Sequence, residues 1–497
     1  MEKIHRNISD LKKSEYELII IGGGIYGTML SLEAARRGIK SILLEKDDFS
    51  SKTTLNNLRT VHGGLRYLQS ADIIRFKESV KERKWFLKYL PEYVNPMPCL
   101  MPLYGKGVYR NSIFRIALTI NDVLSFYRNK NLPESKKLPN GKVITAKESA
   151  EIFKLIDKKG LKGSACWYDA GVEEFQRLNM KLIHTAVSTG AEFINYFEVQ
   201  DVLVKNKKVF GIIGTDKLSG ETLKIKSKKI INAAGPWSRI FAEGFDKDYP
   251  GLFKKNLLLW NILFDREALS EYALGLSTRK GKKHTYFFHP WKGRLLIGTG
   301  EKIVDNIGDK AFVKKEFIEE FMNDINSIVP GISLKKSDIL RVYSGILPAT
   351  DKGTLAKRPG MIDHWKAGGP AGAYSISGVK FTTSRLVAEK MIKYIFSNRK
   401  KKSYKELFGI KNSDNEVFFE YNEKIDKRKL EVLKKVVNNE SVIHLSDLAS
   451  RRTSISDNPK RAVNAADELK KLFPGLEDGW NDEILSLKDE LYGNYEV

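Results

Sequence analysis

Cysteine is nearly absent from this sequence, which has only Cys99 and Cys166 among 497 residues. Two cysteines cannot build the disulfide framework that stabilises small secreted proteins. The seven histidines show no metal-ligand spacing such as CxxC or HExxH, so we expect no metal site. This cysteine usage indicates a reducing compartment, and we predict a cytoplasmic protein.

Long hydrophobic runs are also missing. The longest apolar stretches, such as LLLWNILF, fall well below the ~20 residues that a membrane-spanning helix needs. The first residues, MEKIHRNISDLKKSEYELIII, carry charges from the start, so we expect no secretory signal. At most we expect a peripheral contact with the inner face of a membrane.

Acidic residues are in deficit. Lys and Arg outnumber Asp and Glu by 85 to 61, and the formal charge of +24 favours anionic partners. Such partners include phosphorylated metabolites, nucleic acid and acidic lipid. The lysines are spread along the chain, as in RKGKK and NRKKKS, and such runs are usually solvated surface. Nucleic-acid binding is therefore a minor alternative.

The length suggests two or three domains, at roughly 100–200 residues each. YELIII, GGGIYG and SILLE form a strand, a glycine turn with a helix, and a second strand. Helical spacing covers residues 78–90 and 112–127, and we interpret the second segment as a core helix rather than a membrane-surface helix. Residues 199–216 predict a hairpin, residues 256–300 predict sheet, and residues 401–497 are helical in pattern.

Gly22, Gly24 and Gly27 form GxGxxG directly after the first predicted strand and at the start of a helix. The first glycine permits a tight turn, the second lets a pyrophosphate approach the backbone, and the third lets helix and strand pack closely. Glu45 ends the second strand, where a carboxylate accepts hydrogen bonds from a ribose. This combination predicts a dinucleotide site.

Two later segments favour FAD over NAD. INAAGPWS, residues 231–238, places small residues at a strand end where the backbone passes close to a cofactor. Gly378 precedes a helix predicted to begin near Lys380, whose positive N-terminal end suits the negative charge of a reduced flavin. A flavoprotein closed by distant segments fits this order.

Several motifs together resemble the FAD-dependent glycerol-3-phosphate dehydrogenases, within the wider superfamily of D-amino-acid-oxidase-like FAD oxidoreductases. They are LIIIGGGIYG, VHGGLRYL, CWYDAG, INAAGPW, YSGILPATD and SGVKFTTSRLVAEK. The resemblance implies non-covalent FAD, oxidation of a polar alcohol by hydride transfer to flavin N5, and electron transfer to a quinone or oxygen at a membrane surface. It also implies an α/β fold, in which a Rossmann-like FAD-binding domain is interleaved with a mixed-sheet substrate domain.

The domain boundaries follow from the same reasoning. The FAD-binding domain is expected at residues 1–75, 145–250 and 340–400, and the substrate domain at 76–144 and 251–339. A small α-helical C-terminal domain is expected at 401–497. A homodimer is one assembly that we consider.

The resemblance also implies the site residues. His62 to Leu68 line the flavin, Arg66 faces the anionic end of the substrate, and Lys380 closes the other side; arginine suits this task because its planar fork binds phosphate or carboxylate bidentately. The predicted cofactor contacts are Gly22, Gly24, Ile25, Gly27, Glu45, Lys46, Thr53, Thr54, His62, Gly63, Gly64, Leu65, Val199, Ala234, Gly235, Trp237, Gly378, Lys380, Phe381 and Thr382.

A base must remove the hydroxyl proton, and histidine has the most suitable pKa. His62 is the first candidate, because Gly63 and Gly64 leave space for a ring system, and His289 is the second. The alternative is that His62 only binds backbone in a tight loop.

The chain departs from the family pattern in three places. Leu347 replaces an arginine, Asn56, Asn57 and Leu58 replace small hydroxyl residues, and Gly298 to Glu301 read GTGE instead of GTTD. Arg341, six positions before Leu347, is the candidate replacement cation.

The predicted function is oxidation of glycerol 3-phosphate or a related phosphorylated or carboxylated alcohol. An amine or 2-hydroxy-acid oxidase and a nucleic-acid-binding flavoprotein are the alternatives.

Overall fold

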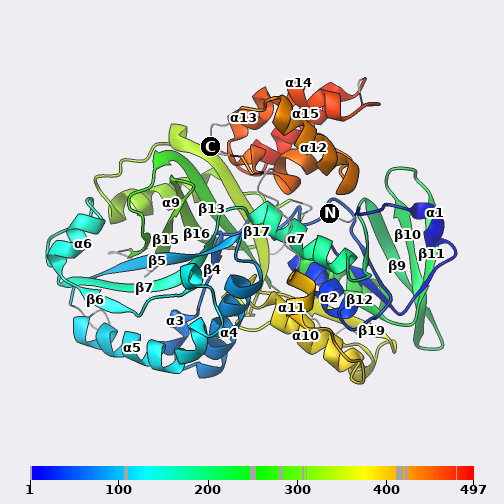
Figure 1. Ribbon diagram of the computed structural model, residues 1–497, viewed down its shortest axis with the longest axis horizontal. Coiled ribbons are helices and arrows are strands. Elements are labelled where there is room, and N and C mark those ends of the chain that lie inside the picture. The colour runs from blue at the N-terminus through cyan, green and yellow to red at the C-terminus, as the bar shows by residue number, and fades with distance from the viewer. Residues whose placement is uncertain are drawn as a thin grey trace.

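The computed structural model describes residues 3–105, 110–246, 253, 255–278, 284–304, 307–308, 310–409, 418–419, 424–476 and 478–496. Three sheets and a cluster of C-terminal helices make up the molecule (Figure 1). The predicted α/β class is confirmed.

The first predicted strand lies in the middle of a six-stranded sheet. In order, this sheet contains β18 (Gly360–Asp363), β19 (Ala373–Ser377), β12 (Ile230–Asn232), β2 (Leu18–Ile21), β3 (Ser41–Leu44) and β8 (Glu192–Ile194). All pairs are parallel except β18 with β19. Every residue of β2 is buried, as in a parallel strand covered on both faces.

The two faces of this sheet have different covers. On one face, helix α2 (Ile25–Ala35) packs against α7 (Phe175–Val187) and α10 (Ser384–Ile395). On the other lies a four-stranded sheet of β1 (Glu15–Tyr16), β11 (Thr222–Ser227), β10 (Lys208–Asp216) and β9 (Phe197–Lys205). The predicted hairpin is confirmed as β9 and β10, and α8 (Ser238–Phe245) lies beside β9 and β19.

A nine-stranded mixed sheet forms the second half. It contains β17 (Ile339–Ala349), β13 (Lys255–Glu267), β16 (Arg294–Val304), β15 (Thr285–Trp291), β14 (Ala273–Ser277), β5 (Val94–Leu103), β7 (Gly163–Val172) and β4 (Thr60–Val61), with β6 (Lys142–Ile144) paired to β7. Its helices are α3 (Leu65–Leu68), α4 (Ile73–Tyr89), α5 (Asn111–Leu124), α6 (Ala146–Ile152) and α9 (Lys315–Ile328). Residues 163–172 and 340–349, which the predicted boundaries give to the FAD-binding domain, pair in this nine-stranded sheet.

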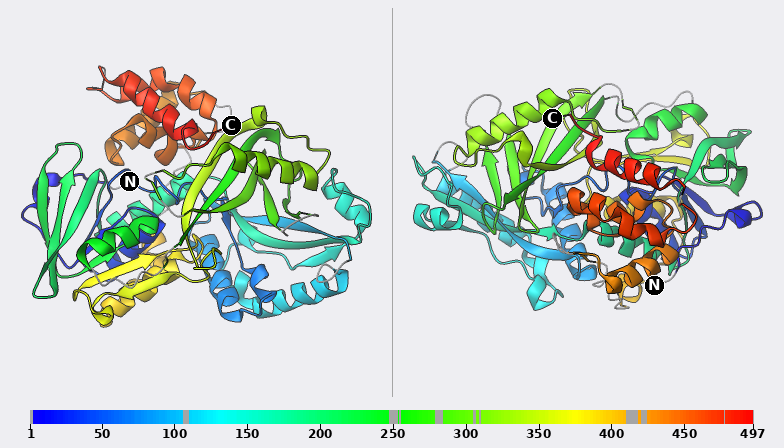
Figure 2. Two further views of the ribbon diagram at one scale, coloured as in Figure 1. Left: turned by 180° about the vertical axis from the view of Figure 1, so that it is seen from behind. Right: turned by 90° about the horizontal axis from the view of Figure 1, so that it is seen from above.

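The C-terminal helices form a layer with its own core (Figure 2). They are α12 (Lys427–Asn439), α13 (Pro459–Asn464), α14 (Ala466–Leu469) and α15 (Trp480–Tyr492), whereas α11 (Tyr404–Phe408) packs on α4 and the short α1 (Ile8–Leu11) lies near the N-terminus. Buried ion pairs attach this layer: Asp48 binds Arg452 at 2.7 Å, and Glu440 binds Arg177 at 2.8 Å.

One sequence interpretation is wrong in part. Most of residues 112–127 do form a helix, α5, which ends at Leu124, but it lies at the surface: Phe114 and Leu118 are buried, whereas Ile116 and Val123 are 61% and 65% exposed. Within the described ranges, no helix combines the length and apolarity needed to cross a bilayer.

Candidate active site

The glycine turn joins β2 to α2 with the geometry that the fingerprint predicts. Gly22 has φ +107°, and a Cβ there would lie 2.6 Å from the carbonyl oxygen of Ala233. A Cβ on Gly27 would lie on the carbonyl oxygen of Gly22, so only glycine allows this approach of helix and turn. The turn therefore brings the N-terminus of α2 to the end of β2, a position that suits an anion.

Two threonines support this turn. The backbone N–H of Ile25 donates to Thr54 Oγ1 at 3.0 Å, and the same oxygen is the nearest atom to a Cβ placed on Gly24. Thr53 Oγ1 donates to the carbonyl of Ile346 at 3.0 Å. Thr53 and Thr54 thus join the glycine turn to β17 of the other sheet. Their predicted contact with the cofactor stays a prediction.

Glu45 is a half-buried carboxylate directly after β3. It accepts hydrogen bonds from the N–H of Gly23 at 2.5 Å and of Asp47 at 2.9 Å. Burial raises the pKa of its carboxyl group. The N–H of Phe197 donates to the carbonyl of Glu45, so β9, with Val199, starts beside this carboxylate. The surroundings of Glu45 fit a hydroxyl donor such as a ribose.

The second cofactor segment touches the first. Ala233 N–H donates to the carbonyl of Ile21, and Lys46 Nζ lies 5.8 Å from the centre of the Trp237 ring. Gly235 has φ +59°, and a Cβ there would meet nothing within 4 Å. This open space next to the glycine turn fits a dinucleotide that passes along Ala234, Gly235 and Trp237.

The third segment packs on the first through Tyr26. A Cβ on Gly378 would overlap the Tyr26 ring, and the Tyr26 hydroxyl donates to the carbonyl of Lys380 at 2.9 Å. Phe381 stacks on Phe86 with ring centres 5.4 Å apart, so its side chain belongs to the core. Helix α10 begins at Ser384, four residues after the predicted start. Backbone contact between Phe381 or Thr382 and the cofactor stays a prediction.

His62 is held by a buried carboxylate. Its Nδ1 lies 3.0 Å from Asp169 Oδ2, while half of its side chain is exposed. Asp169 Oδ1 accepts from the N–H of Gly63 at 2.6 Å and from Arg83 Nη1 at 2.8 Å. Burial raises the pKa of Asp169, but the hydrogen bond from His62 and the charges of His62 and Arg83 outweigh it, and the pKa is lowered to about 2. An ionised Asp169 leaves Nε2 of His62 free to accept a proton.

Glycine occupies the two positions after His62 for a different reason from the one we expected. A Cβ on Gly63 would overlap the guanidinium of Arg83, and one on Gly64, at φ +86°, would press on Tyr67 and Ser79. Protein side chains, not an empty slot for a ring, fill this space. Contact of Gly63, Gly64 and Leu65 with the flavin through the backbone stays a prediction.

The segment after His62 carries one cationic side chain, Arg66, and a second, Lys380, lies beside this segment in space. Arg66 on α3 is exposed. Lys380 Nζ lies 4.1 Å from the centre of the Tyr67 ring. Burial, and then the charge of Arg66, lower the pKa of Lys380 to about 8. Arg66 and Lys380, separated by more than 300 positions in the sequence, therefore lie close enough for their charges to interact, and a shared anion-binding region stays a prediction.

His289 differs from His62. It is 5% exposed, and its Nδ1 lies 3.0 Å from the carbonyl of Leu58. Burial lowers its pKa to about 4, so the ring is neutral at neutral pH with Nδ1 as the donor. Its role is to hold the loop before His62, and its candidacy as the base is not supported.

Arg341 is not a replacement cation. Its Nη1 donates to the carbonyl and to the hydroxyl of Ser456, at 3.1 and 3.0 Å, and it packs over Tyr343. Six strand positions also span roughly 20 Å, so it lies far from Leu347. Its function is to fix the C-terminal layer to β17.

Most departures from the family pattern are explained by internal contacts. Asn57 accepts from the N–H of Arg59 at 2.7 Å and so supports the positive φ of that residue. A Cβ on Gly300 would overlap the indole of Trp260, which stacks on Phe317 in the core. Leu58 lies against Gly298. Leu347 is half-buried and lies two positions from Gly345, which is beside Thr53, and its bearing on the substrate stays a prediction.

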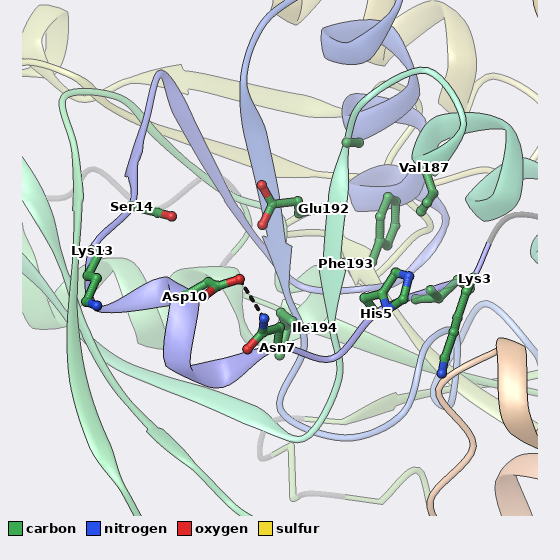
Figure 3. Close-up of a pocket in the computed structure, with 12 residues that line it drawn as sticks. Lys3, His5, Asn7, Asp10, Lys13, Ser14, Val187, Glu192, Phe193 and Ile194 are labelled. Carbon is green, nitrogen blue, oxygen red and sulfur yellow. Dashed lines mark hydrogen bonds between the residues drawn. The ribbon is translucent and has the colours of Figure 1, made fainter.

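The sequence interpretation did not name Asp169, Arg83, Tyr67 and Tyr26 individually, although Tyr67 lies within the range His62 to Leu68. Three of them lie within the motifs themselves, since Asp169 belongs to CWYDAG, Tyr67 to VHGGLRYL and Tyr26 to LIIIGGGIYG. The sequence does not show which residues these side chains contact, and for that reason their roles were not predicted. A separate cavity of about 490 Å³ lies between the N-terminal segment and β8 (Figure 3). None of the predicted site residues lines it.

Comparisons with known proteins agree with this geometry. Residues 17–393 match the family model described as FAD dependent oxidoreductase. The chain is 30% identical over 406 residues to a glycerol-3-phosphate dehydrogenase of Synechocystis sp., covering 79% of this chain and 72% of the relative. It is 32% identical over 414 residues to an aerobic glycerol-3-phosphate dehydrogenase of Staphylococcus aureus, covering 81% and 70%.

A solved structure also resembles it. The glycerol-3-phosphate dehydrogenase from Bacillus halodurans, complexed with FAD, superposes with a TM-score of 0.73 at 20% identity, covering 97% of this chain and 96% of the other. At this identity the likeness shows a shared fold.

Proposed function

Because this chain belongs to the family of FAD-dependent glycerol-3-phosphate dehydrogenases, we propose that it oxidises the secondary hydroxyl of glycerol 3-phosphate to a ketone. The observations that support this proposal are the contact between His62 and Asp169, the interaction of Arg66 with Lys380, and the hydrogen bond that joins Lys380 to Tyr26 at the start of α2. FAD is the cofactor, and the chain is an oxidoreductase acting on a CH–OH donor.

Substrate binding is assigned to the two cations. Arg66 offers a planar, permanently charged fork to the phosphate, and Lys380 offers a point charge. Burial is the larger cause of the low pKa of Lys380, and repulsion by the charge of Arg66 is the smaller one. An incoming dianion offsets this repulsion and so favours the charged lysine. Tyr67 beneath Lys380 holds the ammonium group in place.

Proton removal is assigned to His62. Bound FAD supplies the acceptor for the hydride that leaves the substrate carbon. Nε2 of His62 takes the hydroxyl proton as the C–H bond of the substrate weakens, and Asp169 stabilises the resulting imidazolium through Nδ1. Asp169 is a positioning residue, since it acts on the substrate only through His62. Arg83 and the N–H of Gly63 fix the carboxylate in turn.

Leu347 is the position at which this chain differs from the family pattern for phosphate binding. It removes one cation from the pattern, and the structure offers no substitute at Arg341. Two cations still match a phosphate, whereas a carboxylate needs only one. We therefore place glycerol 3-phosphate before an amine or a 2-hydroxy acid as substrate.

The test is an anaerobic reduction screen on the purified yellow protein. Glycerol 3-phosphate should bleach the flavin absorbance, while glycerol, 2-hydroxy acids and amino acids should leave it unchanged. Bleaching by an amino or hydroxy acid but not by glycerol 3-phosphate would contradict the proposal and support the oxidase alternative.

Electrons must then leave the enzyme. We propose a quinone or oxygen as the acceptor, and a membrane contact if the acceptor is a quinone, because quinones reside in the bilayer. Comparing the reoxidation rate with air and with a soluble quinone under nitrogen separates the two acceptors.

A further inference from the structure

Two arginines of the C-terminal layer form ion pairs across its boundary. Arg451 and Arg452 end the helical segment Asp447–Arg452, which lies between α12 and α13. Both side chains are buried, and both contact Asp48, which lies outside the layer, four positions after the end of β3. A buried ion pair often stabilises a fold no better than apolar side chains would, so this cluster indicates a requirement for fixed geometry.

The carboxylate of Asp48 is enclosed by donors. Arg452 Nη1 and Nη2 each donate to it at 2.7 Å, and Arg451 Nε donates at 2.7 Å. Asn195 Nδ2, directly after β8, donates at 2.9 Å. Burial raises the pKa of Asp48, but the charges of Arg452 and Arg451 outweigh it, and the pKa is lowered to about 2. The carboxylate is therefore ionised at neutral pH, and three side chains fix its position.

The segment that carries Asp48 also supports the glycine turn. We call residues 45–54 the β3 loop. Gly23 donates its N–H to Glu45 at 2.5 Å, and its carbonyl accepts from the N–H of Ser50 at 3.0 Å. Asp48 lies between Glu45 and Ser50 in the sequence. The β3 loop therefore contacts the glycine turn on both sides of the residue that binds the C-terminal layer.

We propose that the C-terminal layer holds the FAD site in its binding conformation, because Arg451 and Arg452 fix Asp48 and thereby the β3 loop. Attachment of the layer and binding of FAD then favour each other, since both require the same loop conformation, and this coupling is reciprocal. The three residues are positioning residues, which act on FAD only through Gly23 and Glu45. The inference rests on the placement of FAD at the glycine turn.

A second buried ion pair of the same layer gives a matched control. Asp457 lies five positions after Arg452, and its Oδ2 accepts from Lys292 Nζ at 2.7 Å. Lys292 lies in the turn between β15 and β16, so this pair attaches the layer to the nine-stranded sheet rather than to the β3 loop. Loss of either pair leaves a buried charge without its partner and weakens the attachment. Only loss of the Asp48 pair should disturb the glycine turn.

FAD release from the full-length holoprotein measures this coupling without turnover. Serial dilution, followed by the fluorescence of the released flavin, gives the dissociation constant of FAD. Arg452→Gln should raise this constant roughly tenfold or more, within the usual range of coupling between two sites. Arg452→Lys, which keeps the charge without the planar fork, should recover part of the affinity. Asp457→Asn should leave the dissociation constant nearly unchanged, although both neutralising variants should lower the melting temperature.

Hydrogen exchange tests the reverse direction of the coupling in the unchanged protein. Backbone amides of residues 443–457 should exchange faster after FAD is removed, because the layer opens more often when the β3 loop is not held. Amides of α9, which packs on the nine-stranded sheet, should exchange at the same rate in both states. This measurement decides the proposal even if Arg452→Gln does not fold.

Three outcomes would overturn the inference. Arg452→Gln could release FAD no more readily than the unchanged protein, or residues 443–457 could exchange at the same rate with and without FAD. Arg452→Gln and Asp457→Asn could also lose FAD equally, which would make the layer a general structural support. The flavin-reduction screen can fail while FAD release still responds to Arg452→Gln, so failure of the proposed function is distinguishable from failure of this inference.

Discussion

The regions around His62 and His289 use the same side chain for opposite purposes. In both, Nδ1 is engaged at 3.0 Å, by the carboxylate of Asp169 in one case and by the carbonyl of Leu58 in the other. His62 is half exposed, whereas His289 is buried and its pKa falls to about 4. A catalytic base needs an accessible nitrogen and a partner that stabilises its charged form, and only the His62 region supplies both.

Replacing the proposed base should give the largest effect. We expect His62→Gln to lower kcat/KM by roughly 10²–10⁴-fold, the range that general-base catalysis supplies. Flavin absorbance should persist, because the substitution leaves the glycine turn and Glu45 unchanged. Steady-state kinetics alongside a visible spectrum measure both, and a loss of only a few-fold would show that another group takes the proton.

Removing the orienting charge should cost less. Asp169→Asn should lower kcat by roughly 10–100-fold, the value of a hydrogen bond to a charged group. Asp169→Glu, which keeps a carboxylate, should recover part of the lost turnover. A melting temperature that falls together with the activity, and no recovery in Asp169→Glu, would indicate that Asp169 only supports the local fold.

Changing the anion-binding region should affect binding more than turnover. Arg66→Ala should raise KM by roughly 10–100-fold while FAD stays bound. Arg66→Lys is the control and should recover part of the affinity. Simultaneous loss of FAD would make Arg66 a structural residue instead.

A pH titration should distinguish Lys380 from Arg66. Because burial and the charge of Arg66 lower the pKa of Lys380 to about 8, KM should rise as pH increases above this value and the ammonium loses its proton. Lys380→Arg should flatten that rise, since arginine stays charged. A flat profile in the unchanged enzyme would exclude Lys380 from the anion site.

The smallest effect on activity is expected at the second histidine. His289→Gln should change kcat by less than roughly threefold, because a buried neutral ring does not exchange protons near neutral pH. Its effect should appear in stability. The unfolded state takes up a proton near pH 6.5 and the folded state near pH 4, so the unfolding free energy falls as pH decreases between these values, by about 3 kcal/mol. Urea denaturation at several pH values should show this dependence in the unchanged protein and its loss in His289→Gln.

The sequence predicted the geometry of the glycine turn better than the contacts around His62. Gly22, Gly27 and Glu45 belong to one continuous strand–turn–helix–strand unit, whose geometry depends on neighbours along the chain. Asp169 lies 107 positions from His62, and no local pattern shows that β7 places its carboxylate there. The same limit explains the errors at Arg341 and α5, because spacing identifies a strand face or an apolar stripe but not what covers it.

The sequence by itself therefore determined the family, the cofactor and the glycine turn between β2 and α2, because the motifs are continuous in the chain and a glycine turn is fixed by local backbone sterics. The tertiary structure decided which histidine is accessible, which carboxylate orients it, and which arginine is already engaged. Those properties depend on burial and on partners brought together across hundreds of residues, and they set the charge and the reactivity of each group.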